Sequence, residues 1–289
     1  MTWQKRKELI KETFLEFFQE KPLLHGAALA YYAMLALVPI LYLTVTYVGR
    51  FIGEDEVIDA IGSLLNENVG LEDSSGILDF LTEMDFSNGS TMMEIFGILT
   101  LMFSCTVIFN SLKGSINEFY NIKKSKIARK KKIVRSLFSR LISLAFIIGL
   151  TLFFILLYFA EPLFLSIAHK LFDSFEVLHD VASRLIRYGV PILTNMLIFS
   201  FIFKFLHDGK VEWRNAIRGG LLTSVLLYFG QLIIKYYLTN FFFGASGGVA
   251  GAMLIILVWV YYSSQIIFFG AKYIVVLSRM RNCEIVFRD

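Results

Sequence analysis

Long runs of uncharged, mostly apolar residues divide the chain into segments. The longest covers residues 238–271, where 34 consecutive positions carry no charged side chain. A helix of about 20 apolar residues crosses the hydrocarbon core of a bilayer. This run is therefore long enough to span a membrane, and its surplus residues form a glycine-rich approach at the N-terminal end.

Five further uncharged runs lie at residues 26–49, 95–112, 141–160, 188–203 and 219–234. The last two are short for a span, but basic residues bracket each of them, and long basic side chains can reach out to the headgroups. We expect the same of Lys272, which directly follows the longest run. Together the runs predict six membrane spans, at residues 26–50, 92–112, 138–160, 188–206, 216–237 and 249–272.

The predicted fold class is all-α: an integral membrane bundle of six transmembrane helices that forms a single domain, residues 1–289. Strands of outer-membrane barrels alternate apolar and polar residues over about 10 positions, whereas these runs are continuous and longer. A helix also satisfies its backbone hydrogen bonds internally, which lipid requires.

Two segments outside the spans have helical patterns of their own. Residues 2–21 predict an interfacial amphipathic helix that ends at Pro22, because one face gathers the apolar residues Ile10, Phe14, Phe17 and Phe18. In residues 53–90 apolar side chains recur at helical spacing, among them Val57, Ile61, Leu64 and Leu65. This spacing predicts short helices.

Composition agrees with a membrane protein. Hydrophobic residues make up 56% of the chain and charged residues 18%, against about 25% charged in typical globular chains. The first 25 residues lack the short apolar core of a cleavable signal peptide. The two cysteines, Cys105 in the second span and Cys283 in the tail, are kept apart by the predicted topology, so we expect no disulfide framework.

The distribution of charge predicts the orientation. Residues 51–112 contain 11 acidic residues and no Lys or Arg, whereas residues 113–140 contain 10 basic residues. The positive-inside rule then places residues 113–137 in the cytoplasm as a basic loop, and residues 53–90 outside as an acidic segment. With six spans, both termini face the cytoplasm, as expected for the inner (plasma) membrane of a bacterium.

The basic loop also favours anionic lipid as a partner. We expect headgroup contacts from Lys123, Lys124, Lys130, Lys131 and Lys132. Clustered cations can instead mark a nucleic-acid site, but no aromatic platform for stacking bases accompanies them. The prediction is therefore membrane lipid and no nucleic acid.

No catalytic pattern is visible in the sequence. The four histidines do not pair at metal-ligand spacing, and the HExxH, CxxC, GxSxG and phosphate-binding glycine motifs do not occur. We therefore predict no enzyme activity, no metal and no cofactor.

Uncharged polar residues within the spans are the candidates for function. Polar side chains facing lipid are costly, so these groups are expected to point into the bundle. The candidate residues for a cavity or substrate site are Tyr31, Tyr32, Asn110, Asn195, Gln231 and Gln265. All but Tyr32 lie on different spans and are expected to converge. For any one of them an interhelical hydrogen bond, of about 0.6 kcal/mol, is the simpler explanation.

Three glycines precede the last span, at residues 244, 247 and 248. Glycine beside bulky residues costs backbone entropy, so this spacing favours a tight turn or a close helix contact. A flexible loop is the alternative.

Several motifs resemble the YihY/BrkB family of inner-membrane proteins. The resemblance rests on GASGGVAGAMLIILVWVYYSSQIIFFGAKY in the last span and on AALAYYAMLALVPIL in the first, supported by EWRNAIRGGLL and LKGSINEFYNI. It covers nearly the whole chain. Two positions depart from the family pattern: Lys272 replaces an acidic residue, and Phe243 replaces a tyrosine.

The resemblance implies a function in the cell envelope. Members were once labelled ribonuclease BN, a label regarded as mistaken, and others are tied to serum resistance and envelope lipid movement. We therefore expect an inner-membrane transporter or exporter of an amphiphilic, lipid-like envelope component. The alternative is a non-transporting membrane protein that supports envelope assembly through partners. The substrate and the oligomeric state do not follow from the sequence.

The predicted orientation is testable by labelling single cysteines in cells. A cysteine at Ser75 should react with an impermeant reagent from outside, and a cysteine at Ser125 only after the membrane is opened. The reverse pattern would overturn the orientation.

Overall fold

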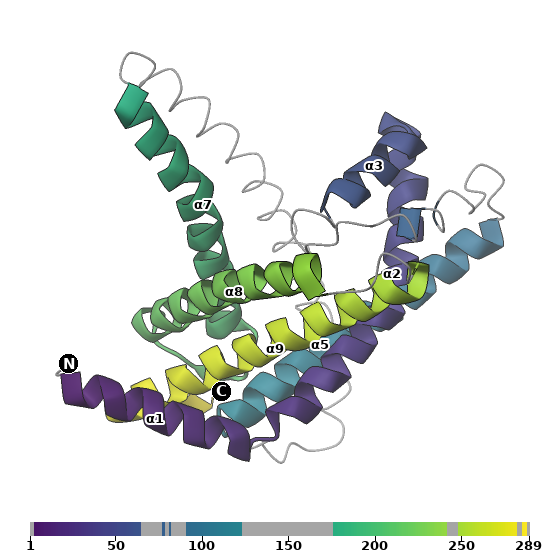
Figure 1. Cartoon of the computed structure of the whole chain (residues 1–289). Helices are drawn as coiled ribbons and strands as arrows, with labels where there is room; N and C mark the ends of the chain where they lie inside the picture. The colour runs from purple at the N-terminus through teal and green to yellow at the C-terminus, as the bar shows by residue number, and fades with distance from the viewer. Residues whose placement is uncertain are drawn as a thin grey trace, which may run out of the picture. The chain divides into compact units, whose positions relative to one another are not determined.

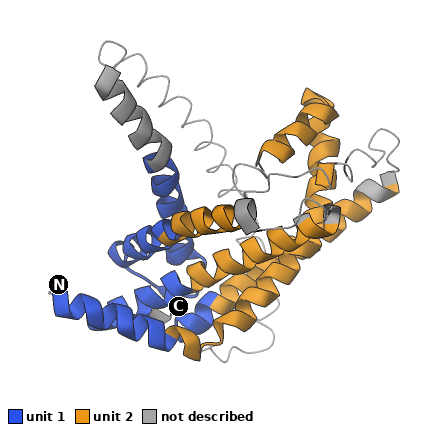
Figure 2. Cartoon of the chain, viewed as in Figure 1, with its two compact units in different colours: residues 1–16, 116–225, 269–289 blue, residues 17–115, 226–268 orange. Residues whose placement is uncertain are grey.

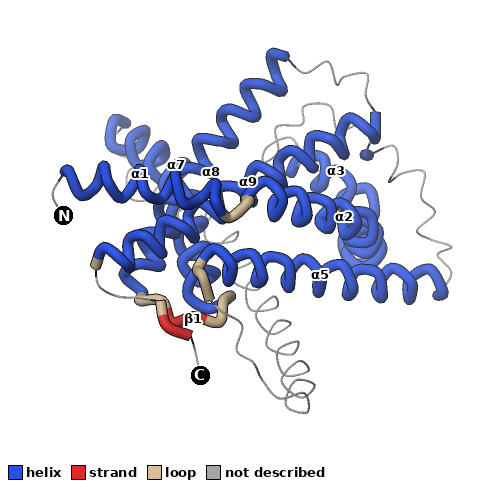
Figure 3. The backbone as a smooth tube through the Cα atoms, turned by 90° about the horizontal axis from the view of Figure 1, so that it is seen from below, coloured by secondary structure: helices blue, strands red, loops and turns tan. Residues whose placement is uncertain are grey.

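The computed structural model describes residues 3–64, 77–78, 81, 91–122, 176–241, 248–281 and 285–287, and nearly all of them are helical (Figures 1 and 3). The helices are α1 (Trp3–Gln19), α2 (Pro22–Ile52), α3 (Glu54–Leu64), α5 (Thr91–Phe119), α7 (Glu176–Phe205), α8 (Trp213–Phe241) and α9 (Gly248–Met280). Two short strands, β1 (Gly209–Lys210) and β2 (Val286–Phe287), pair antiparallel.

Four of these helices are long and apolar enough to cross a membrane. Their apolar parts are Pro22–Ile52, Ile95–Phe119, Trp213–Tyr237 and Met253–Met280, which match the first, second, fifth and sixth predicted spans. In α7 the apolar part, Gly189–Phe205, is shorter, and the third predicted span lies outside the described residues. The all-helical prediction is confirmed, while the count of six remains a prediction.

The break between α1 and α2 lies at the predicted proline. Lys21 adopts a left-handed backbone conformation, with φ of 51°, and Pro22 occupies the first turn of α2. Proline suits that position because its missing N–H would have no partner inside the helix. The chain therefore changes direction here, and α1 is a separate helix.

The chain divides into two compact units, coloured in Figure 2. Unit 1 comprises residues 1–16, 116–225 and 269–289, and unit 2 comprises residues 17–115 and 226–268. Each unit collects segments far apart in the sequence, and each has a buried apolar cluster of its own.

In unit 2, α2 and α5 pack side by side. The Ser115 hydroxyl lies 2.9 Å from Nδ1 of His25. Towards the other end, a Cβ on Gly97 would lie 3.6 Å from the side chains of Tyr42 and Leu43. Residue numbers rise along one helix as they fall along the other, so the two helices are antiparallel.

Helix α3 covers an apolar cluster in the same unit. Val57, Ile58 and Ile61 are buried there with residues of α2 and with Ile255 and Ile256 of α9. Gly53 provides the sharp turn into α3, because its φ of 105° is one that other residues rarely adopt. The helix predicted from Val57 and Ile61 is confirmed. Leu65 lies outside the described residues.

In unit 1, glycine allows α7 and α8 to approach closely. A Cβ on Gly220 of α8 would lie 2.6 Å from the backbone oxygen of Met196 and 2.4 Å from Oγ of Ser200, both on α7. Backbone cannot yield as a flexible side chain does. The α7–α8 crossing therefore depends on the absence of a side chain at Gly220.

Two glycine substitutions test this crossing. Gly220→Ala should destabilise the protein by about 1–3 kcal/mol, the usual cost of overpacking. Gly114→Ala on α5 is the matched control, because nothing lies within 4 Å of its Cβ position. It should stabilise the protein by about 0.5–1 kcal/mol. Unfolding in mixed micelles measures both, and equal effects would contradict the close approach.

Candidate functional site

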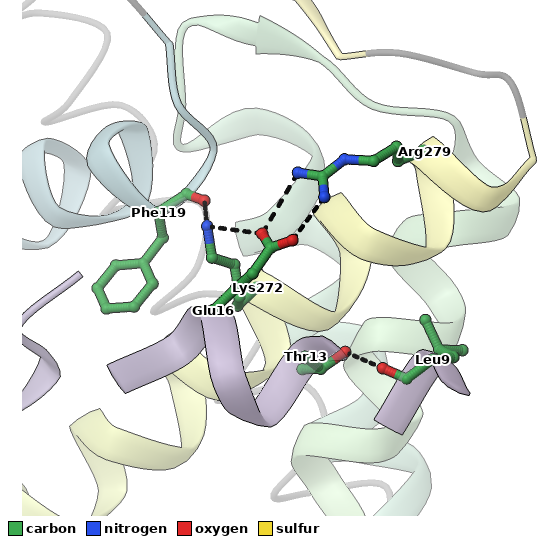
Figure 4. Close-up of polar contacts among 6 residues, drawn as sticks. All are labelled: Leu9, Thr13, Glu16, Phe119, Lys272 and Arg279. Carbon is green, nitrogen blue, oxygen red and sulfur yellow. Dashed lines mark hydrogen bonds and ion pairs between the residues drawn. The ribbon is translucent and has the colours of Figure 1, made fainter. Parts of the chain in front are cut away.

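Three charged side chains meet in unit 1, where α1 packs against α9 (Figure 4). Glu16 comes from α1, and Lys272 and Arg279 come from α9. Lys272 and Arg279 are seven residues apart, or about two helical turns, so they lie on one face of α9. We call these three residues the charge cluster.

Lys272 is the buried member of the charge cluster, with 1% of its side chain exposed. Its Nζ lies 3.5 Å from Oε2 of Glu16 and donates a 3.2 Å hydrogen bond to the backbone oxygen of Phe119. That oxygen belongs to the last turn of α5, where unpaired carbonyls give the helix end a partial negative charge. One ammonium group thus joins α1, α5 and α9.

The expectation that Lys272 extends to the headgroups is wrong. Helix α9 continues to Met280, so Lys272 lies eight residues before the end of the helix. Its neighbours supply a carboxylate and a carbonyl, which replace the water that a lysine at a helix end would reach. Burial is therefore compensated by these two partners.

Arg279 holds the same carboxylate from its other side. Its two terminal nitrogens donate hydrogen bonds to the two oxygens of Glu16, the second at 3.3 Å. Partial burial would raise the pKa of Glu16, but the hydrogen bond and charge of Arg279, aided by the charge of Lys272, outweigh it. The net pKa of Glu16 is lowered, so the carboxylate stays ionised at neutral pH.

Apolar contacts support the charge cluster. Leu9 of α1 packs against Val276 and Leu277 of α9, and the buried Thr13 hydroxyl donates to the backbone oxygen of Leu9 (Figure 4). Only one of the four residues on the predicted apolar face of α1, Phe17, is buried. The other three, Ile10, Phe14 and Phe18, are exposed.

A second polar cluster lies in unit 2, where α2, α5 and α9 meet. Gln265 of α9 donates a 3.1 Å hydrogen bond from Nε2 to the backbone oxygen of Pro22. A Cβ on Gly26 would lie 1.9 Å from that same nitrogen, so the glycine makes room for the glutamine. His25 contacts Ser115 on one side and the ring of Phe268 on the other.

Other residues that carry the family resemblance also lie at helix contacts. Tyr262 fills the space beside Gly230 and donates to the backbone oxygen of Leu226. Asn117 forms two 2.9 Å hydrogen bonds with Asp208, one to its side chain and one from its backbone. Trp213 packs edge-on against Phe201 and Phe205. Several positions of the resemblance thus hold helices and loops together.

Comparison with known families identifies the group. The family described as Virulence factor BrkB matches residues 13–287, which is nearly the whole chain. The chain belongs to the BrkB family.

Relatives of this BrkB-family protein cover most of its length. The UPF0761 membrane protein MS0032 of Mannheimia succiniciproducens is 25% identical over 81% of this chain and 77% of its own. The putative ribonuclease-like protein YfkH of Bacillus subtilis is 21% identical over 80% of this chain and 81% of its own. A UPF0761 membrane protein of Kangiella koreensis is 23% identical over 83% of this chain and 55% of its own. No solved structure matches the chain.

The BrkB-family structure places the predicted cavity residues in different surroundings. Gln265 is hydrogen-bonded as described, Tyr31 is 59% exposed and lies edge-on to Tyr32, and Asn110 is exposed. Gln231 is half-buried in unit 2 and Asn195 half-buried in unit 1. Convergence of Tyr31, Asn110, Asn195, Gln231 and Gln265 therefore stays a prediction.

Other predicted sites lie outside the described residues. These are the lipid-contacting lysines of the basic loop, residues 123–124 and 130–132, and the glycines at 244 and 247. Gly248 begins α9, but the space around it is not described. Within the described part of the chain, no three His, Cys, Asp or Glu residues group as metal ligands.

Sequence reasoning missed Glu16, His25 and Asp208. Glu16 follows Glu12 and precedes Glu20 at the four-residue spacing of a helix face, so spacing alone does not single it out. Lys272 is the residue that could have led to Glu16, because a cation within a membrane segment needs a charged or polar partner nearby.

The ion pair predicts a pH-dependent stability. At neutral pH, Glu16→Gln should cost about 2 kcal/mol, between the values for exposed and buried pairs. The folded pKa of Glu16 lies below its unfolded value, so this contribution is full above the ordinary glutamate pKa. It is lost as pH falls through the lowered folded pKa.

Unfolding midpoints of wild type and Glu16→Gln across a pH series measure this difference. The exposed Glu8 on the same helix provides the control, and Glu8→Gln should stay within about 0.5 kcal/mol of wild type at every pH. A Glu16→Gln effect that persists unchanged in acid would contradict the ion pair.

Proposed function

We propose that this BrkB-family membrane protein moves an amphiphilic, lipid-like envelope component across the bacterial inner membrane. Six spans place both termini in the cytoplasm, and α1 lies at the cytoplasmic interface. Its exposed apolar residues enter the lipid and its lysines contact anionic headgroups. The proposal includes no enzyme step, no cofactor and no nucleic acid.

The observation that carries the proposal is a polar seam between α2 and α5. On α5, Ser104 and Ser111 share a helix face with Gly97 and Ser115, and both of those residues contact α2. Ser104 and Ser115 are buried. The serine positions therefore lie on the α2 side of α5 over about three helical turns of a candidate membrane span.

Helix α2 presents polar groups to the same seam. Tyr32 and Thr46 follow His25 at multiples of seven residues, which keeps them on one helix face. Thr46 is buried, and its hydroxyl has no hydrogen-bond partner among the described residues. Unpaired polar groups inside a membrane are costly, so this hydroxyl supports a pathway that accepts a polar headgroup.

The outer face of α5 suits the acyl chains of an amphiphile. It exposes large apolar side chains, among them Phe96, Leu99 and Phe103. The polar headgroup would lie against the hydroxyl groups of the seam, while the apolar acyl chains would lie in the surrounding lipid. Movement along the seam would require α2 and α5 to separate, and Gly97 reduces the side-chain contact that opposes this.

One set of observations favours the second function, a membrane protein that supports envelope assembly through partners. Gln265, Tyr262 and Asn117 form hydrogen bonds that join helices and loops. Residues that carry the resemblance would then serve a rigid scaffold. The two functions differ in whether the purified protein alone moves lipid.

Headgroup-labelled lipid in reconstituted vesicles tests the transport function. Wild type should accelerate the movement of the label between leaflets. Ser104→Ala/Ser111→Ala should slow it about tenfold, because two hydrogen bonds of about 0.5–1.5 kcal/mol each are lost. Thr106→Ala on the same helix is the control, since the Thr106 hydroxyl bonds the backbone oxygen of Met102 within α5.

Three outcomes distinguish the functions. Fast movement that the double variant slows and the control does not supports the seam. If the double serine variant and the Thr106→Ala control move lipid at the same rate, the pathway does not follow the seam. Vesicles with protein that match protein-free vesicles exclude movement of this lipid and favour the scaffold.

The lipid partner is testable in the basic loop. Neutralising Lys130, Lys131 and Lys132 should weaken binding to anionic vesicles, because each cation near the surface contributes about 1 kcal/mol to the binding free energy. The triple Lys→Arg variant keeps the charge and should bind like wild type. Tight, salt-sensitive RNA binding that only the neutral variant loses would identify nucleic acid as the partner instead.

A further inference from the structure

Three helices of unit 1 bring two arginines and a tyrosine hydroxyl together. Arg6 belongs to α1, Arg218 to α8 and Tyr273 to α9. The positive charges of Arg218 and Arg6 both act on the Tyr273 hydroxyl, so both guanidinium groups lie near it. We call these three residues the arginine cluster; none of them belongs to the charge cluster.

Packing between α1 and α9 brings Arg6 towards Tyr273. Tyr273 packs against the small apolar cluster that Leu9 of α1 forms with Val276 and Leu277 of α9. Arg6 lies three residues before Leu9, so the two side chains share a face of α1. The apolar contact therefore holds Arg6 on the side of α1 that meets Tyr273.

A close approach between α8 and α9 brings in Arg218. A Cβ on Gly219 of α8 would lie 2.3 Å from the side chain of Ile274 on α9. Arg218 and Tyr273 are the residues that directly precede these two in the sequence. The meeting of the arginine cluster thus follows from helix packing as well as from the electrostatic interaction.

The polar groups of the arginine cluster are available to a ligand. Among the described residues, neither Arg6 nor Arg218 has an ion-pair or hydrogen-bond partner, and the Tyr273 hydroxyl forms no hydrogen bond. Arg6 is exposed, and Arg218 and Tyr273 are half-buried. Two cations near one hydroxyl, with no carboxylate paired to either, make the local potential positive and attract an anion.

The arginine cluster lies at the depth where lipid headgroups are expected. The predicted fifth span begins at residue 216 and the sixth ends at residue 272, next to Arg218 and Tyr273. Two exposed tryptophans, Trp3 and Trp213, precede Arg6 and Arg218 by about one helical turn. Tryptophan is enriched at the boundary between membrane and water, so both arginines are expected near this boundary.

The chemistry of the arginine cluster fits a phosphate monoester. A guanidinium group donates two parallel hydrogen bonds to phosphate oxygens, and a phenolic hydroxyl donates one more. A phosphate monoester offers three such oxygens and a charge of about −1.5 to −2 at pH 7, which two arginines balance. A phosphodiester has one negative charge and two non-ester oxygens, so it matches the three donor groups less well.

We propose that Arg6, Arg218 and Tyr273 form a binding site for a phosphate monoester, the headgroup chemistry of phosphatidic acid. The two guanidinium groups neutralise the phosphate, and the Tyr273 hydroxyl donates a hydrogen bond to one of its oxygens. A bound phosphate joins α1 to α8 and α9 at the membrane surface. The site goes beyond the transport function, because no residue of the polar seam takes part in it.

Chemical modification of arginine tests the site in the full-length wild type. Phenylglyoxal reacts with accessible guanidinium groups, and peptide mass spectrometry reports each arginine separately. In nanodiscs, phosphatidic acid should slow the modification of Arg6 and Arg218 about threefold more than phosphatidylglycerol at the same surface charge, because the monoester forms more hydrogen bonds. Arg214, an exposed arginine of α8, is the internal control and should be slowed equally by both lipids.

Variants distinguish a shaped site from a diffuse positive surface. Binding of short-chain phosphatidic acid to the purified protein should weaken about tenfold in Arg218→Gln and about threefold in Arg218→Lys, because an ammonium group keeps the charge but not the planar fork. Tyr273→Phe removes one hydroxyl and should weaken binding about threefold. Lys11→Gln removes one charge from another face of α1 and should bind like wild type.

Thermal midpoints without phosphatidic acid check the folding of these variants. They should stay close to wild type, because the Arg218 guanidinium and the Tyr273 hydroxyl form no hydrogen bond with a described residue. The modification experiment on wild type does not depend on this result.

Inorganic phosphate added to phosphatidylcholine nanodiscs, with chloride as the reference salt, separates the two sources of the ligand. Protection of Arg6 and Arg218 by phosphatidic acid alone identifies a lipid headgroup, and protection by free phosphate identifies a soluble monoester or phosphate ion. Equal protection by phosphatidic acid and phosphatidylglycerol, or unchanged binding in Arg218→Lys and Tyr273→Phe, would overturn the proposal. Modification that neither phosphate source slows would do the same.

Discussion

Lipid cannot form hydrogen bonds with a polypeptide backbone, and this constraint explains most of what the structure shows. Every long apolar segment that the structure describes is a helix, because a helix satisfies its own peptide groups. Helices of this kind gain little by hiding apolar surface from lipid, so close packing and scarce polar contacts must join them. Gly220 against the α7 backbone, and Gly26 beside Gln265, are such contacts.

Buried charge follows different physics from buried backbone. Lys272 can lie inside unit 1 because a carboxylate and a helix-end carbonyl replace its water shell. The same ammonium group joins three helices whose residues are far apart in sequence. The resemblance to the family motif implies an acidic residue at this position, where this chain has a cation. Glu16 on α1 supplies the negative partner.

Polar groups within the spans have one role that the structure shows and a second that belongs to the proposed function. Gln265 and Tyr262 donate to backbone oxygens of neighbouring helices, which strengthens the packing. The serines of α5 lie along a helix face that contacts α2, where a hydroxyl can serve a passing headgroup as well as a neighbour. The scaffold function and the proposed transport function are compatible with the same pair of helices, α2 and α5, because weak hydrogen bonds between helices also allow the helices to separate.

The sequence by itself determined the helical class, four of the spans, the break at Pro22 and the helix that begins after Gly53, because hydropathy and proline chemistry act locally. Family membership also followed from local motifs. Only the tertiary structure decided which polar residues meet. Glu16 looks like any exposed acid on an amphipathic helix, and Lys272 looks like a lysine at the end of a span. Their pairing depends on how α1 crosses α9, which is set by packing between segments more than 250 residues apart.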